Sequence, residues 1–179
     1  VCVIVDTAYP GDIIGIHDPG IFNIGDTLCQ DQSKLQYAGI PQFAPEHFSK
    51  IYTKNSLKRK QFLKGIKQLS EEGSIQVYKR PNIGMEELII GVVGVLQFEV
   101  LEYRLKNEYG VDIISERLPF RYIRWVKMDS FDPNKFSLPM DTMIAENENK
   151  DPVLLFQNEW SIRHVQERNE GVVLKEVSL

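Results

Sequence analysis

Apolar residues at helical spacing predict an amphipathic helix over residues 57–72. Phe62, Ile66 and Leu69 fall on one face of this helix, and lysines dominate the opposite face. Gly73 follows at the position where helices commonly end, because glycine adopts the left-handed backbone conformation without steric cost. We therefore expect a helix that packs one face on a sheet and exposes the other.

A second predicted helix, over residues 95–109, is apolar on two faces. One face carries Val95, Phe98, Leu101 and Leu105, and the nearly opposite face carries Leu96, Val100 and Tyr103. A sheet covers only one face of a helix, so the second face predicts a further packing neighbour. That neighbour is the C-terminal segment of this chain or another domain, and we favour the intrachain option as the more economical.

Four short segments with strand-forming composition alternate with these helices. They span residues 47–53, 75–79, 87–90 and 111–116, and residues 81–84 have the composition of a hairpin turn. The resulting order, βαββαβ, is typical of a ferredoxin-like unit. We assign it to residues 37–118, which open with a linker over residues 39–45, where two prolines disfavour regular structure.

The first thirty residues have an all-β pattern with two glycine-aspartate turns. Gly11-Asp12 and Gly25-Asp26 each precede apolar, strand-forming residues; glycine tolerates a positive φ and aspartate bonds the turn backbone. We expect residues 1–36 to be the C-terminal part of a β-barrel domain. The chain starts with a valine inside an expected strand, which predicts a piece cut from a longer protein.

A small α/β lobe is predicted over residues 119–179. Strands are expected over residues 121–127, 153–156 and 172–177, with a helix capped by Asn158 and running through Glu170. No element is assigned to residues 129–150, where Pro133 and Pro139 discourage a long helix. The expected fold class is therefore α+β: a barrel remnant, a ferredoxin-like unit and a C-terminal α/β lobe, with residues 37–179 forming one domain.

Composition and charge narrow the class of protein. The chain has 179 residues, of which 42 % are hydrophobic and 26 % charged, and no apolar run approaches the ~20 residues of a membrane span. No signal-peptide pattern follows Val1, so we expect a soluble, cytoplasmic protein with no membrane partner. The net charge of −4 argues against a surface that binds nucleic acid throughout, although a local basic stripe remains possible.

Residues suited to catalysis, cofactor binding or metal binding do not form recognisable motifs. Cys2 and Cys29 are isolated, and His17, His47 and His164 lack metal-ligand spacing. The phosphate-binding pattern Gly-x-x-x-x-Gly-Lys-Ser/Thr is absent, so we expect no GTP site, no metal site and no catalytic residues in this chain. The glycines of 91–94 could cradle an anion at a helix start, but their apolar neighbours favour close backbone packing.

A line of lysines is the first candidate for binding a partner. Lys60, Lys64 and Lys67 lie on the exposed side of the first predicted helix, where they can neutralise RNA phosphates. The alternative is an ordinary solvated face in which Glu71 pairs with Lys67 at i,i+4. The sequence leaves these two interpretations evenly balanced.

Two arginines after the ferredoxin-like unit are weaker candidates for RNA contact. Arg121 and Arg124 lie at the start of the predicted strand 121–127. The alternative for them is pairing inside the domain, with Glu99 or Glu116.

Several segments resemble one family of translational GTPases, peptide chain release factor 3. Ala8-Tyr-Pro-Gly-Asp12 and Gly25-Asp-Thr27 resemble the end of the barrel domain of translational GTPases in general. The segments that resemble the third domain of release factor 3 are Gly39–Glu46, Gln68–Val77, Gly91–Val100, Arg104–Tyr109, Arg124–Val126 and Val165–Arg168. Elongation factor G shares the glutamate pair and the glycine-rich helix entry, and a fragment of that family is the alternative.

The resemblance implies a function for the intact protein. It implies a GTPase, with GTP and Mg²⁺ bound outside this chain, that ejects codon-reading release factors in translation termination. Its implied partners are the small-subunit RNA and protein of the ribosome and the protein's own GTP-binding domain. An alternative of another class is a ferredoxin-like acyl-phosphate hydrolase or small-ligand regulatory domain, for which Arg80 beside Pro81–Gly84 is the only suitable loop.

Overall fold

A computed structural model describes residues 4–17, 19, 21–22, 25–29, 37, 43–81, 87–127 and 136–176. The chain divides into two compact units, Val1–Gly39 and Ile40–Leu179. Each unit is described by itself below.

The first unit contains the predicted glycine-aspartate turns. In the first turn the Asp12 N–H donates to the Tyr9 carbonyl at 3.0 Å, and the Asp12 carboxylate accepts from the Tyr9 N–H at 2.8 Å. Gly11 and Gly25 both have positive φ, at 99° and 96°, as predicted. No strand occurs among the described residues of this unit, so the assignment to a β-barrel domain stays a prediction.

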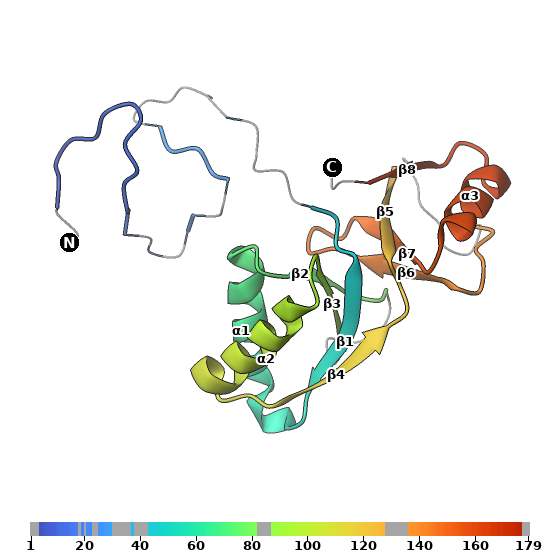
Figure 1. The fold of residues 1–179 in the computed structure, drawn as a ribbon, viewed down its shortest axis with the longest axis horizontal. Coiled ribbons are helices and arrows are strands. Elements are labelled where there is room, and N and C mark those ends of the chain that lie inside the picture. Colours follow the sequence, from blue (N-terminus) through green and yellow to red (C-terminus); the bar gives the residue numbers. More distant parts are fainter. Residues whose placement is uncertain are drawn as a thin grey trace. The chain divides into compact units, whose positions relative to one another are not determined.

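The ferredoxin-like lobe has the predicted βαββαβ order (Figure 1). Its elements are β1 (His47–Thr53), a 3-10 turn (Ser56–Lys58), α1 (Arg59–Glu71), β2 (Gln76–Tyr78), β3 (Leu88–Val92), α2 (Leu96–Tyr109) and β4 (Ile113–Leu118). The sheet order is β2-β3-β1-β4 with every pair antiparallel, which is the arrangement of a split-βαβ fold. The hairpin turn itself lies mostly outside the described residues, which resume at Glu87.

Both helices of this lobe end on glycine, as the sequence predicted. Gly73 has φ 70° after α1, where the Ser74 N–H donates to the Leu69 carbonyl at 3.1 Å. Gly110 has φ 65° at the end of α2. The α-helical part of the first helix starts at Arg59 instead of Leu57, because Asn55 caps a 3-10 turn first, accepting from the Leu57 N–H at 3.0 Å.

The C-terminal lobe is a second antiparallel sheet with one helix. Its elements are β5 (Tyr122–Lys127), β6 (Thr142–Glu146), β7 (Pro152–Phe156), α3 (Glu159–Arg168) and β8 (Val173–Lys175), and the sheet order is β6-β7-β5-β8. Asn158 caps α3 as predicted, accepting from the Ser161 N–H at 3.0 Å. Strand β6 was not predicted, because its residues show no clear alternation: Ala145 is buried and its neighbours on both sides are half buried.

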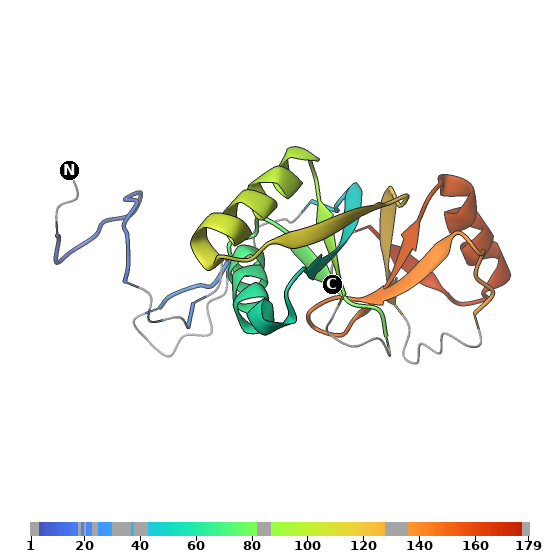
Figure 2. The ribbon, with the colours of Figure 1, turned by 90° about the horizontal axis from the view of Figure 1, so that it is seen from below.

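The two sheets pack face to face, so that the second unit has four layers. One core lies between α1, α2 and the first sheet, and another lies between β7, β5 and α3. The core between the sheets includes Phe48, Tyr78 and Ile89 from the first and Ile123 and Leu155 from the second. In both views α1 and α2 lie at one end of this unit and α3 at the other (Figures 1 and 2). The α+β fold class is confirmed.

Backbone hydrogen bonds also join the two lobes. Lys79, next to β2, and Glu146, in β6, exchange two bonds of 2.9 and 2.7 Å. Together with the shared core, this contact makes the second lobe a cover for the face of the first sheet that the helices leave bare.

One prediction about packing is wrong. The C-terminal lobe does not cover the second apolar face of α2, because it packs on the opposite side of the first sheet. Leu96, Val100 and Tyr103 are therefore exposed on α2.

Candidate functional site

The three candidate lysines lie on the solvent side of α1. Lys60, Lys64 and Lys67 are all exposed, while Phe62 and Ile66 on the other side of the helix are buried. This placement follows from the amphipathic pattern, since burial of the apolar face turns the lysines outward. The sequence therefore located this surface correctly.

The lysines differ in their ion pairs. Lys67 pairs with Glu71 at 3.4 Å in the predicted i,i+4 arrangement. An exposed pair of this kind contributes only ~0.2–1 kcal/mol, so Lys67 can exchange it for another anion. Lys60 and Lys64 make no ion pair within the described part of the chain. Two unpaired positive charges one helical turn apart remain on this surface.

The two candidate arginines have different environments. Arg121 is exposed, and its backbone N–H donates to the Phe156 carbonyl at 2.9 Å. The side chain of Arg124 is only 16 % exposed and pairs with Glu176 at 2.8 Å. The expected alternative partners, Glu99 or Glu116, are wrong, because β8 lies next to β5 and brings Glu176 beside Arg124.

A wide groove of about 1060 Å³ lies beside these arginines, where the linker and β1 meet the β4–β5 connection. Its lining carries charges of both signs: Arg117, Arg121, Arg124, Glu46, Glu159 and Glu176. The mixed charge gives the groove no clear preference for an anion such as RNA.

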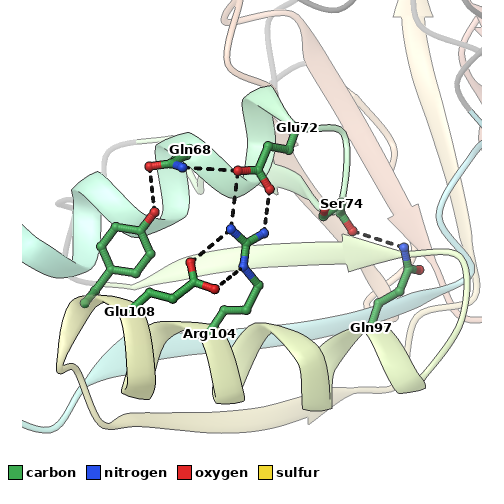
Figure 3. Close-up of polar contacts among 7 residues, drawn as sticks. Gln68, Glu72, Ser74, Gln97, Arg104 and Glu108 are labelled. Atoms are coloured by element: carbon green, nitrogen blue, oxygen red, sulfur yellow. Dashed lines mark hydrogen bonds and ion pairs between the residues drawn. The ribbon is translucent and has the colours of Figure 1, made fainter. Parts of the chain in front are cut away.

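A network of ion pairs and hydrogen bonds connects α1 to α2 (Figure 3). The Arg104 guanidinium donates to both carboxylate oxygens of Glu72 at 2.5 and 3.3 Å, and to both of Glu108 at 2.8 and 3.0 Å. Gln68 extends the network, because its amide donates to Glu72 at 3.2 Å and its carbonyl accepts from the Tyr109 hydroxyl at 2.7 Å. We call these five residues the helix clamp.

Electrostatics in the helix clamp favour the charged forms. Hydrogen bonding to Arg104 lowers the pKa of Glu72 below its usual value of 4.5, in spite of partial burial. The two carboxylates raise the pKa of Arg104, mainly through the hydrogen bonds to Glu108 and Glu72. The sequence pattern did not predict this network. Arg104 and Glu108 could have been found by their i,i+4 spacing, but only the tertiary structure adds Glu72.

Gln97 fixes the loop that precedes α2. Its carbonyl accepts from the N–H groups of Val93 and Gly94 at 3.0 and 2.9 Å, and its amide donates to the Ser74 carbonyl at 3.1 Å (Figure 3). The N–H groups of Val93 and Gly94, two of those that could have cradled an anion, are therefore already used.

Gly91 is needed for close packing. The apolar neighbours in the sequence favoured this interpretation over an anion cradle. A Cβ at this position in β3 would lie 2.8 Å from the Pro45 Cγ and 3.0 Å from the Tyr78 ring.

Within the described residues, no group of histidine, cysteine, aspartate and glutamate has the arrangement of a metal site. A search of the same residues finds no helix long and apolar enough to cross a membrane.

Similarity to known proteins shows which family the chain belongs to. The family described as "Class II release factor RF3, C-terminal domain" matches residues 37–166. Proteins named peptide chain release factor 3 are 46 % identical over 96 % of this chain in Symbiobacterium thermophilum, 45 % over 90 % in Trichormus variabilis and 42 % over 92 % in Staphylococcus carnosus. The chain spans 30–32 % of the length of these three relatives. The helix clamp, Gln97 and the lysine stripe all lie inside the matched region, and the chain belongs to the peptide chain release factor 3 family, as a part of its C-terminal region.

Proposed function

We propose that this chain is the ribosome-docking part of a release factor 3-type GTPase acting in translation termination. In this proposal the intact protein promotes dissociation of the codon-reading release factors, and GTP with Mg²⁺ binds in a part outside this chain. The chain itself is noncatalytic and works in the cytoplasm. Support comes from the family match over residues 37–166 and from the relatives, which are named peptide chain release factor 3.

The exposed lysine stripe on α1 is the observation that carries the docking role. Lys60 and Lys64 stand on a rigid helix whose other face is buried, so their charges are held one turn apart at little entropic cost. Ribosomal RNA presents a dense array of phosphates, and each neutralised phosphate releases condensed counterions. We infer that the lysine stripe, which consists of Lys60, Lys64 and Lys67, binds the small-subunit RNA. The exposed Arg121 is a further candidate for RNA contact.

Arg124, on β5, has a structural role in this proposal. Its guanidinium is held by Glu176 and by the Ile123 carbonyl, and it lies 6.0 Å from the Tyr122 ring centre. These contacts favour a role in fixing β8 against β5 over direct RNA contact.

The test measures cosedimentation of the chain with purified small ribosomal subunits over a series of salt concentrations. The double variant Lys60→Glu, Lys64→Glu is expected to bind more than ten-fold more weakly and to lower the slope of log affinity against log salt by about 2, because two phosphate contacts are lost. The matched control is Lys106→Glu, Lys127→Glu, which changes net charge equally at exposed sites elsewhere. Equal weakening in the control, or none in the stripe variant, would contradict the assignment.

Two alternative functions have less support than this proposal. The family match and the relatives favour release factor 3 over elongation factor G. The acyl-phosphate hydrolase or regulatory-domain alternative rests on Arg80 and a loop that lies mostly outside the described residues. Turnover of an acyl phosphate by the purified chain, without cosedimentation, would favour that alternative.

A further inference from the structure

An apolar surface remains on the outer face of α2 and the loop before it. Leu96, Val100 and Tyr103 recur at i, i+4 and i+7 and are 65, 49 and 68 % exposed. Val93 in the preceding loop is also exposed, whereas the exposed Val95 lines the groove beside β1 and the β4–β5 connection. We call Leu96, Val100 and Tyr103 the outer apolar face. Isolated exposed apolar residues are common in proteins, but a contiguous stripe on one helix marks an interaction surface.

The structure holds this face outward. Phe98, Leu101 and Leu105 are buried against α1 and the first sheet, which fixes the rotation of α2 about its axis. Arg104 ties the same helix to Glu72, the C-cap residue of α1, at a second point. The outer apolar face therefore cannot turn into the core of this unit.

The loop before α2 is also constrained. Gln97 accepts from the backbone N–H groups of Val93 and Gly94 at two points of this loop, and its amide donates to the Ser74 carbonyl. The first turn of α2, which carries Leu96, is therefore held in place. A preorganised apolar surface loses little conformational entropy when a partner covers it.

The size of the face favours a tethered partner. Three side chains of this size expose apolar surface on the order of a few hundred Å², whereas a stable interface between separate chains needs about 800 Å² from each partner. A partner on the same polypeptide has an effective concentration in the millimolar range, which makes a small interface sufficient. Interfaces between domains of one chain have this character.

We propose that the outer apolar face docks the preceding part of the intact polypeptide, and this inference rests on the proposed function, in which that part binds GTP. The chain spans only 30–32 % of its relatives' length, so an intact family member has a long further stretch of polypeptide that can supply the cover. Glu99, one helical turn from both Leu96 and Tyr103, is exposed and makes no ion pair within the described residues. We therefore expect the partner surface to be apolar, with a basic group facing Glu99.

The test places a thiol on the face and measures its accessibility. Val100→Cys is made both in the 179-residue chain and in the intact release factor that contains it, and alkylation by a maleimide is followed at that residue by mass spectrometry. Glu102→Cys is the matched control, since it is exposed on the same helix but lies away from the stripe. The thiol at position 100 should react at least ten-fold more slowly in the intact protein, and the control thiol equally fast in both.

Each other outcome overturns the inference. Equal reactivity at position 100 in both proteins means that the preceding part does not cover the face. Slow reaction in the 179-residue chain at every protein concentration means that the chain covers itself, and slowing only at high concentration means that a second copy does. Because no ribosome is present, failure here is distinct from failure of the cosedimentation test.

A second variant distinguishes loss of docking from local unfolding. Val100→Asp changes a side chain that is half exposed in the described unit, so the 179-residue chain should keep its unfolding temperature within ~2 °C. In the intact protein, Val100→Asp should restore fast alkylation of a thiol placed by Leu96→Cys. Continued protection at position 96 would contradict docking through this face.

Discussion

The helix clamp gives the strongest prediction about stability, through the substitution Arg104→Met. Methionine keeps much of the aliphatic volume but removes the four hydrogen bonds to Glu72 and Glu108, which measure 2.5 to 3.3 Å. Hydrogen bonds to charged groups contribute about 1.5–3 kcal/mol when buried, while exposed ion pairs contribute only ~0.2–1 kcal/mol. With the Arg104 side chain 22 % exposed and its partners 39 and 45 % exposed, the clamp lies between these limits.

We therefore expect Arg104→Met to lower the free energy of unfolding by about 2 kcal/mol. For a chain of this size that corresponds to a fall of roughly 4–8 °C in the unfolding temperature, measured by circular dichroism. The matched control is Lys67→Met, which breaks the exposed pair with Glu71 and should cost less than about 0.5 kcal/mol. A double-mutant cycle with Glu72→Gln should give a coupling of at least ~0.5 kcal/mol between Arg104 and Glu72.

The pH dependence gives an independent check. The pKa of Glu72 is lowered in the folded protein, mainly by Arg104, so its contribution is present above the unfolded value of 4.5 and is lost as pH falls through the folded value. The stability difference between the wild-type chain and Arg104→Met should consequently shrink below pH 4.5. A coupling near zero, or a difference that does not change with pH, would refute the clamp as a stabilising element.

Two further predictions concern the interior of the first lobe. Gly91→Val should destabilise the fold by about 1–3 kcal/mol in urea unfolding, because a Cβ there lies 2.8 Å from the Pro45 ring and 3.0 Å from the Tyr78 ring; unchanged stability would contradict the observed packing. Burial raises the pKa of Tyr78 above its usual value of 10.0. As pH rises above 10, the unfolded chain releases this proton before the folded chain does, so the free energy of unfolding falls by up to ~1.4 kcal/mol per pH unit. Urea unfolding from pH 8 to 11 should show a shallower decline for Tyr78→Phe, and parallel curves would exclude this effect.

Most elements of the second unit could be predicted from the sequence because their signals are local. The face of α1 that carries Phe62 and Ile66 followed from spacing, and the left-handed glycines at 73 and 110 followed from the backbone freedom of glycine. Strand β6 could not be predicted, since Thr142–Glu146 becomes a strand through pairing with β7, and its side chains have no pattern of their own.

Part of the candidate site could also be predicted, because its signal is local. Which side of α1 exposes Lys60 and Lys64 depends only on helical geometry, so the sequence sufficed. The partner of Arg124 depended on which strand lies beside β5, and Glu176 on the end of β8 is distant in sequence. Pair contacts between distant segments carry no periodic signal.

The sequence by itself determined the order of elements, the side of α1 that faces solvent, and membership of a recognisable family. The tertiary structure alone decided where the second lobe packs, and it placed that lobe on the bare face of the first sheet instead of on α2. Both surfaces are apolar, and periodicity shows only that each needs cover. Tyr78, Phe48 and Ile89 on the sheet form one core with the second sheet, while the outer apolar face of α2 stays exposed in this unit.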